Sequence, residues 1–547
     1  MEKLPIELGI LIAKELPTRD ICRLQQTCKA FYDLIEGDSE LWRERLRHQC
    51  GADVLWSSFF TASELRRACT GTLRFKHRYR RGGHPTLPIS RLLPHKGEDD
   101  QLQNHRDRSQ YWHHLYPEER STFSLIPGGR FLITVDKKWL RVWDLGPPGS
   151  LNEPCEVVLH EINCVDTQPM IVDVAVADKD MVHLLIREDH SVRRLPQPFD
   201  QSQYNLNALS KVRIFRRFQM RLPDMGQHSV EGLGRLCVLH SYKGLHGLCA
   251  AQHGPVVALG IGKSFLLWGT SDSPDKSWVA SATRRGYGNT TGQDVFFHQG
   301  YAFVVDADAL NGFDLAGITH CPVGKGVVDI QDGTPDFGYI PTPQMWTHQQ
   351  YAPNTFTAWA SNFMLHKPVA DEGPLFYDIR DPRPDANRLD LSPSYVRFCF
   401  RFRPDNPSAG SPLRTKRYQT ATQPCDMPQL RFPLDDGVAG YIWYDSLDYP
   451  DRERQLERGG IFVSILDDPD SPEPSMLEDD PDFPEPGSVV KGLGDFSEMI
   501  ARPNNETGVL RVSMCPLSGR VVVLWNRESK DDQVIEIFDL YDSLPTI

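Results

Sequence analysis

A repeated glycine-to-aromatic pattern constrains the fold of this 547-residue chain more than any other feature. Each copy begins with a glycine, continues through an apolar run and a polar turn, and ends a second run on an aromatic residue. The four copies run from Gly129 to Trp143, from Gly254 to Trp268, from Gly300 to Phe313 and from Gly519 to Phe538. Each has the length of two strands joined by a tight turn, so each predicts a β-hairpin.

The spacing of these copies indicates a larger periodic domain. The steps between their aromatic ends are 125, 45 and 225 residues, which approximate three blades, one blade and five blades of roughly 40–45 residues each. Weaker strand pairs at 171–195, 438–444 and 461–466 fall in the gaps. Radial repetition lets more than about 400 residues of short strands share a core with few exposed edges.

The pattern resembles WD40-like β-propellers, and it predicts one propeller of six to eight blades over residues 121–547. Only one copy retains Trp-Asp, and none has Gly-His at the usual spacing, so the number of blades stays open. A β-sandwich or barrel with repeated hairpins is the alternative. The first copy starts near residue 123 and the last ends close to the C-terminus, so we expect the first and last blades to meet.

The first 48 residues have a helical pattern instead. Apolar residues recur every four positions, at Leu4, Leu8, Ile12 and Leu16. Pro5 suits the first helical position and Pro17 stops the helix, after which Thr18 is expected to cap a second one. The second apolar set is Ile21, Leu24, Cys28, Phe31 and Ile35, with a possible break near Thr27. A third short helix is expected to begin at Leu41-Trp42.

The run Leu4-Pro5-x-Glu7-Leu8 to Phe31, closed by Leu41-Trp42-Arg43, resembles an F-box. The resemblance implies docking to a Skp1-type adaptor, which links F-box proteins to a cullin–RING ubiquitin ligase. The adaptor-binding candidates that it implies are Leu4, Pro5, Ile6, Leu8, Ile12, Leu16 and Leu24, with Trp42 supporting the third helix. A helical cap that packs on the rest of the chain is the alternative from periodicity alone.

Residues 49–120 read as a basic connector between the two domains. A helix is expected from Ser63, and residues 66–81 hold seven cations among sixteen residues. Basic residues interleaved with aromatics can indicate RNA contact or nuclear import. We favour a structural connector, whose arginine stems lie along a neighbouring domain while their charged ends stay in water. Residues 82–120 read as an irregular linker or an extended wrap over the next domain.

Composition excludes several classes of protein. The net charge of −13 argues against nucleic-acid binding, because phosphate contacts usually require a basic excess. Twelve cysteines without a Cys-x-x-Cys pair predict no metal site and a reducing compartment, cytoplasmic or nuclear rather than secreted. No apolar stretch approaches 18 residues, so no membrane span is expected.

Two segments of the propeller region have unusual compositions. Residues 467–487 contain nine carboxylates and six prolines, which predicts a solvated surface loop, with phosphorylation of Ser471 or Ser475 as the alternative. The aromatic stretch 345–366 fits either a partner-binding surface or buried strands.

No catalytic motif is complete. Gly262-Lys263-Ser264 looks like the end of a phosphate-binding loop, but it lacks the preceding glycine and the following helix, so it predicts a hairpin turn. We therefore expect no cofactor and no catalytic residue. The expected function is that of a substrate receptor in a Skp1–cullin–F-box ubiquitin ligase with an unidentified protein substrate. The alternatives are an F-box scaffold that acts outside a cullin ligase and, least favoured, a propeller enzyme.

Overall fold

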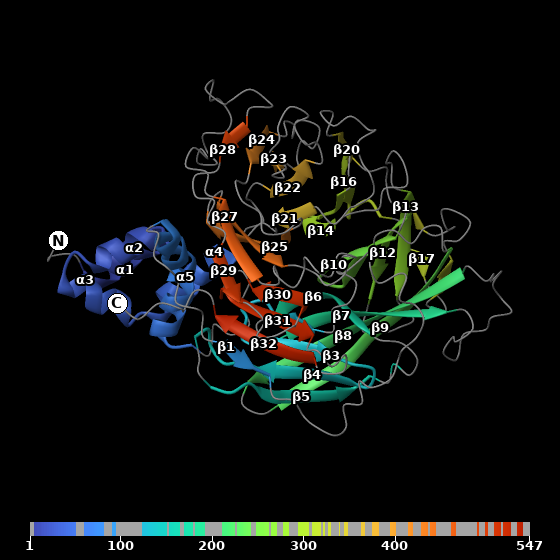
Figure 1. Cartoon of the computed structure of the whole chain (residues 1–547), viewed down its shortest axis with the longest axis horizontal. Coiled ribbons are helices and arrows are strands. Elements are labelled where there is room, and N and C mark those ends of the chain that lie inside the picture. The colour runs from blue at the N-terminus through green and yellow to red at the C-terminus, as the bar shows by residue number, and fades with distance from the viewer. Residues whose placement is uncertain are drawn as a thin grey trace.

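The computed structural model describes residues 5–50, 60–80, 90–93 and 123–149, and from residue 152 to residue 539 the strands given below with short adjoining turns. Helices form the N-terminal part, drawn in blue in Figure 1, and strands form the remainder. The predicted order of a small helical module before a mainly-β domain is confirmed.

The five helices are α1 Ile6–Glu15, α2 Thr18–Gln25, α3 Lys29–Glu36, α4 Ser39–Cys50 and α5 Ala62–Arg80. Pro5 occupies the capping position of α1, which begins one residue later than expected, and Pro17 instead of Thr18 occupies the capping position of α2, one residue earlier than expected. The second predicted helix is two helices, because the chain leaves helical geometry at Thr27 and Cys28.

Side chains cap the later helices. The Asp38 carboxylate accepts hydrogen bonds from the backbone N–H groups of Glu40 and Leu41, both at 3.0 Å, and so begins α4. Thr61 and Glu64 form a reciprocal capping box at the start of α5. The Thr61 backbone N–H donates to Glu64 Oε2 at 2.9 Å, and the Glu64 N–H donates to Thr61 Oγ1 at 3.3 Å.

The hydrophobic core of the helical module extends past residue 48. It contains the buried residues Ala13, Ile21, Ile35, Leu41, Trp42, Leu46, Phe60, Leu65, Ala68 and Cys69. The last four belong to α5 or directly precede it, although the sequence placed them in the connector. A short helical unit buries too little surface alone, and α5 supplies the missing apolar side.

The strands described form seven sheets. The first contains β2 Phe123–Leu125, β3 Phe131–Val135, β4 Trp139–Asp144 and β5 Cys155–Glu161. The second contains β6 Met170–Asp178, β7 Met181–Ser191, β8 Ser210–Asp224, β9 Gln227–Ser241 and β18 Val327–Asp329. The third contains β10 Leu248–His253, β11 Val256–Ile261, β12 Ser264–Gly269, β13 Trp278–Thr283, β17 Cys321–Pro322 and β19 Gly338–Tyr339.

The other four sheets repeat this arrangement. The fourth contains β14 Asp294–His298, β15 Tyr301–Val305, β16 Ala309–Asp314 and β20 Gln344–Thr347. The fifth contains β21 Phe363–His366, β22 Leu375–Asp381, β23 Ser394–Phe400, β24 Arg414–Gln419 and β28 Val489–Lys491. The sixth contains β25 Pro428–Asp435, β26 Val438–Tyr444, β27 Ile461–Leu466 and β29 Glu498–Ala501. The seventh contains β30 Gly508–Cys515, β31 Arg520–Asn526, β32 Gln533–Asp539 and β1 Ser90–Leu92.

The four predicted hairpins are confirmed as the second and third strands of four sheets. Their glycines stand in the turn before the second strand, where φ is +73° at Gly129, +52° at Gly254, +77° at Gly300 and +66° at Gly519. This left-handed backbone favours glycine because a Cβ atom would crowd the following carbonyl. The aromatic ends lie on the third strands, where Trp143 pairs with Leu132 and Trp268 with Val257.

The weaker predicted strands are also confirmed, as β6, β7, β26 and β27. β11 and β12 pair at Ile261 and Ser264, while Gly262 and Lys263, where the sequence predicts a turn, lie outside the described residues. The aromatic stretch 345–366 contributes to β20 and β21, while residues 348–362 and the acidic segment 467–487 lie outside the described residues.

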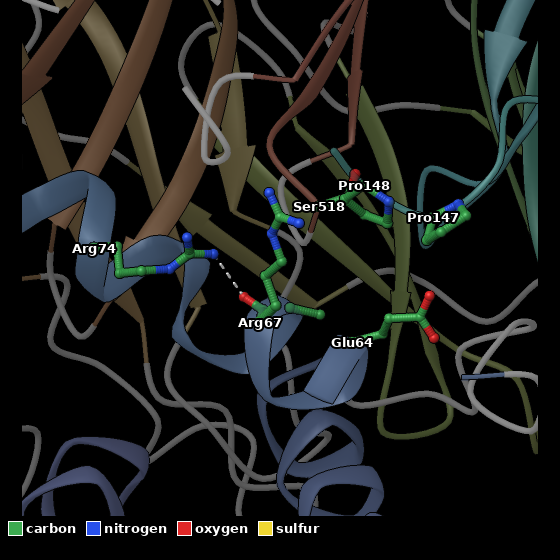
Figure 2. Close-up of a pocket in the computed structure, with 7 residues that line it drawn as sticks. Glu64, Arg67, Arg74, Pro147, Pro148 and Ser518 are labelled. Atoms are coloured by element: carbon green, nitrogen blue, oxygen red, sulfur yellow. Dashed lines mark hydrogen bonds between the residues drawn. The ribbon is translucent and has the colours of Figure 1, made fainter. Parts of the chain in front are cut away.

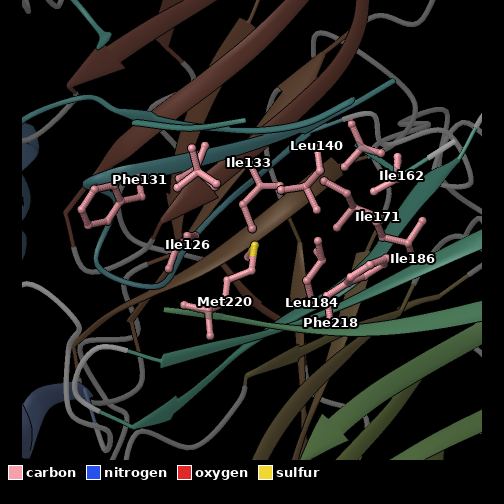
Figure 3. Packing of buried hydrophobic residues seen from close by; sticks show 14 of the residues in the cluster. Ile126, Phe131, Ile133, Leu140, Ile162, Ile171, Leu184, Ile186, Phe218 and Met220 are labelled. Carbon is pink, nitrogen blue, oxygen red and sulfur yellow. The ribbon is translucent and has the colours of Figure 1, made fainter. Parts of the chain in front are cut away.

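The first strands of the sheets contact one another in a closed ring. Going round, β2 contacts β6, then β10, β14, β21, β25 and β30 follow, and β30 contacts β2 again. The largest core clusters accordingly lie between neighbouring sheets. Figure 3 shows one of them, where Ile133 and Leu140 of the first sheet face Leu184 and Met220 of the second.

The seventh sheet is completed by a segment far from it in the sequence. β1 pairs antiparallel with β32, with Arg91 opposite Ile537. The sequence left residues 82–120 as an irregular linker or an extended wrap over the next domain, and residues 90–92 fit the wrap, as a strand added to the seventh sheet. Three residues are too few for a periodic pattern to show, so only the pairing with β32 reveals them.

Candidate docking face of the helical module

Helix α1 has an unusual distribution of side-chain sizes. Its inner side carries small residues, since Gly9 and Ala13 are buried. A Cβ atom added to Gly9 would lie 3.1 Å from Leu34 Cδ2 and 3.6 Å from Phe31 Cε1, both on α3. The glycine therefore lets α1 approach α3 closely, and the bulky residues of α1 remain on the other side.

Those bulky residues form one exposed apolar face. The exposed fractions are 45% for Leu8, 57% for Leu11 and 45% for Ile12. The spacing of three and four residues places them on one side of the helix, and Pro5, which is also exposed, precedes Leu8 by three residues. We call Pro5, Leu8, Leu11 and Ile12 the docking face.

Several predicted residues lie on this face and others do not. Pro5, Leu8 and Ile12 are exposed as a contact surface requires, while Leu4 and the side chain of Ile6 lie outside the described residues. Leu16 and Leu24 are half-buried and pack against the helical core. Leu11 was absent from the predicted set, although its place in the apolar stripe was a usable signal.

Trp42 supports the module from inside, in agreement with the expectation that it supports a helix rather than forming part of an exposed face. The side chain is fully buried, and its Nε1–H donates to the backbone oxygen of Ile35 at 3.0 Å. Cys69 of α5 donates its thiol to the backbone oxygen of Trp42 at 3.3 Å. Burial raises the pKa of the Cys69 thiol to about 12, so this thiol stays protonated as a packing group.

Ion pairs hold α1 and α5 in place around this core. Lys14 of α1 lies 2.8 Å from Glu44 of α4, and the hydrogen bond to Glu44 raises the pKa of Lys14. Arg66 of α5 pairs with Glu36 of α3, which also accepts a hydrogen bond from Gln25 at 3.2 Å. These pairs add to the packing that holds α1 and α5 against the other helices.

No group of three or more metal-ligating side chains occurs among the described residues. Within the same residues, no helix is long and apolar enough to cross a membrane. The eight cysteines that the structure describes are free thiols.

Comparison with known proteins gives one family match. Residues 1–48 match the sequence model of the F-box-like family, and no curated protein matches the chain. This interval contains α1 to α3 and most of α4, and hence the whole docking face.

Among solved structures, the chain is similar to the N-terminal domain of Nup159, with 8% identity and a TM-score of 0.30 over 77% of this chain and 90% of that one. It is also similar to the WD40 domain of Neurospora crassa Pan2, with 10% identity and a TM-score of 0.30 over 76% and 88% of the two chains. Likeness at this distance carries no information on function. The N-terminal 48 residues are thus an F-box-like domain, in a chain whose remaining described part is mainly sheet.

Proposed function

We propose that this protein is a substrate receptor of a Skp1–cullin–F-box ubiquitin ligase. The docking face would bind a Skp1-type adaptor, and the ring of sheets would bind the protein substrate. The observation that carries the proposal is the exposure of three large apolar side chains on α1, inside the interval that matches the F-box-like family. Such a row on a helix suits a partner that buries it.

The ring is proposed to be a seven-bladed β-propeller. Seven sheets and a closed cycle of contacts between their first strands support this number. Loops at the ends of such blades would supply the substrate contacts.

The proposed mechanism is proximity. Holding a substrate lysine near a charged ubiquitin carrier raises the effective concentration of the two reactants, so the receptor itself needs no catalytic residue. The proposal includes a cytoplasmic or nuclear location, where cullin ligases operate.

Adaptor binding tests the proposal directly. Leu8→Ala combined with Ile12→Ala should weaken binding of a purified Skp1-type adaptor by at least about 100-fold, because two apolar anchors are lost. The matched control is Arg19→Ala, an exposed residue of α2 outside the docking face. Failure of the unmutated protein to bind the adaptor at micromolar concentration would contradict the proposal.

Co-purification separates a ligase receptor from a scaffold. A receptor should bring down cullin together with the adaptor, whereas a scaffold outside the ligase should bring down the adaptor alone. The substrate can then be sought by proximity labelling, comparing the intact protein with the Leu8/Ile12 double variant. The substitution is preferable to deletion of residues 1–48, because deletion would strip the core partners from α5.

A further inference from the structure

Residues 90–93, which we call the strap, pair with the last strand of the ring, although they precede its first sheet in the sequence. Arg91 pairs with Ile537 of β32, and the Leu93 N–H donates to the Ile535 oxygen at 2.9 Å. In the sequence the strap follows α5 and precedes the first sheet. The last sheet therefore gains its outer strand from a segment placed between the helical module and the ring.

Arg91 connects the strap to both ends of the ring. Its Nη1 donates to the backbone oxygens of Leu145 and Asn152, both at 2.8 Å, in the segment between β4 and β5 of the first sheet. Its Nη2 donates to Asp539 Oδ2 at 3.2 Å, at the end of β32. The nearly buried Arg91 side chain thus joins the segment before β5 to the end of β32. Gly149 and Asp539, which share a hydrogen bond there, are 390 residues apart in the sequence.

A second arginine secures the same carboxylate. The fully buried Arg520 donates to both oxygens of Asp539, at 2.6 and 3.0 Å, and also to the backbone oxygens of Gly129, Gly146 and Pro147. Two guanidinium groups therefore share Asp539. Burial and the charge of Arg520 lower the pKa of Arg91, although Asp539 opposes this shift.

Helix α5 lies opposite the loop that this cluster holds. A small cavity lies between Arg67, Ala68 and Arg74 of α5 and Pro147, Pro148 and Ser518 of the ring, and Figure 2 shows the two sets facing each other. The Leu145–Gly149 loop is therefore hydrogen-bonded to Arg91 and Arg520, and it faces α5 across the cavity. Because α5 also contacts β25 of the sixth sheet, loosening the strap would change how α5 lies on the ring without detaching it.

We propose that the strap is a releasable clamp, with Arg91 as its positioning residue. The orientation of the helical module then depends on whether the strap is paired with β32 and closes the ring. The strap pairs through only three residues, whereas β31 and β32 pair through seven. If Arg91 moves into water, Arg520 still neutralises Asp539, so release leaves no buried charge without a partner. The clamp can therefore open while the sheets stay folded, and the distance between the docking face and the ring then varies.

Hydrogen exchange on the full chain tests the clamp. Arg91→Ala should raise the exchange rate of the Leu93 and Gly149 amides about tenfold or more, because the strand and the loop that carry these amides lose the bonds that Arg91 makes. The amides of β11, β12 and α3 should exchange as in the unmutated protein. Small-angle scattering should show a larger maximum dimension. The control is Leu92→Ala on the same strand, since Leu92 is 54% exposed.

Arg91→Lys provides a second measurement that does not depend on the alanine variant folding. It keeps the charge but loses the fork that reaches three acceptors, so intermediate exchange is expected. The clamp is refuted if Arg91→Ala matches Leu92→Ala, if Arg91→Ala accelerates exchange throughout the chain, or if Arg91→Lys behaves as the unmutated protein.

Discussion

Apolar side chains are buried in strand β12 but exposed on helix α1. In β12 every residue from Ser264 to Gly269 is buried, because neighbouring sheets cover both faces of the strand. In α1 the small residues face inward and Leu8, Leu11 and Ile12 face solvent. The contrast shows that apolar residues of the ring serve packing, whereas those of α1 are available to a partner.

The largest expected effect is in the core of the helical module. Trp42→Ala should lower the free energy of unfolding of the module by about 3–5 kcal/mol, because it empties a large buried volume. Hydrogen exchange should report the loss in α2 to α5 and leave the sheets protected. Equal loss in both regions would show that the two do not unfold separately.

Alanine substitution of two glycines of the repeat should lower the stability of the ring by different amounts. A Cβ atom on Gly129 would lie 2.0 Å from Ser518 Oγ, whereas a Cβ atom on Gly254 meets no atom within 4 Å. Both have positive φ, so Gly254→Ala should cost about 1 kcal/mol from backbone strain and Gly129→Ala about 3 kcal/mol with the added clash. Chemical unfolding of both variants measures the difference, and equal costs would refute the close packing at Gly129.

Acid should weaken the junction of the second and third sheets through His183. Burial, followed by the charge of Arg217, lowers the pKa of His183 from 6.5 to about 4, and Arg217 Nη2 lies 2.7 Å from its Nδ1. Between pH 6.5 and about pH 4, His183 therefore binds a proton in the unfolded chain but stays neutral in the folded chain. Stability is therefore complete above pH 6.5 and falls as the pH drops toward 4, by at most about 1.4 kcal/mol per pH unit.

His183→Gln should flatten this pH dependence by roughly 1–2 kcal/mol between pH 7 and pH 5. Urea unfolding at several pH values measures it, with the exposed His228→Gln as the control. An unchanged slope in His183→Gln would show that His183 is not the group responsible.

The smallest change in stability should come from the docking face. Leu11→Ala should alter the free energy of unfolding by no more than about 0.5 kcal/mol, because more than half of the side chain is already exposed. Adaptor binding should nevertheless weaken. A large loss of stability would mean that Leu11 belongs to the core, which would remove the contrast between α1 and β12.

Much of the local structure could be predicted from short patterns. The hairpins at Gly129 and Gly519 follow from a turn glycine before alternating strands, and α1 follows from the four-residue apolar period. Leu16 and Leu24 could not be separated from the exposed Leu8 and Ile12 in the same way, because periodicity shows that a residue is apolar but not what covers it. Of the predicted docking residues, Pro5, Leu8 and Ile12 are exposed and Leu16 and Leu24 are half-buried, and their role in binding stays a prediction.

Local sequence thus determined which segments are helices and which are hairpins, since turn geometry and apolar spacing act over a few residues. The closure of the ring and the size of the helical module depend on contacts between distant segments. Arg91 meets Asp539, and Cys69 of α5 meets Trp42, only after the chain has folded back on itself. Such partners are chosen by packing and charge in three dimensions, and no spacing along the chain encodes them.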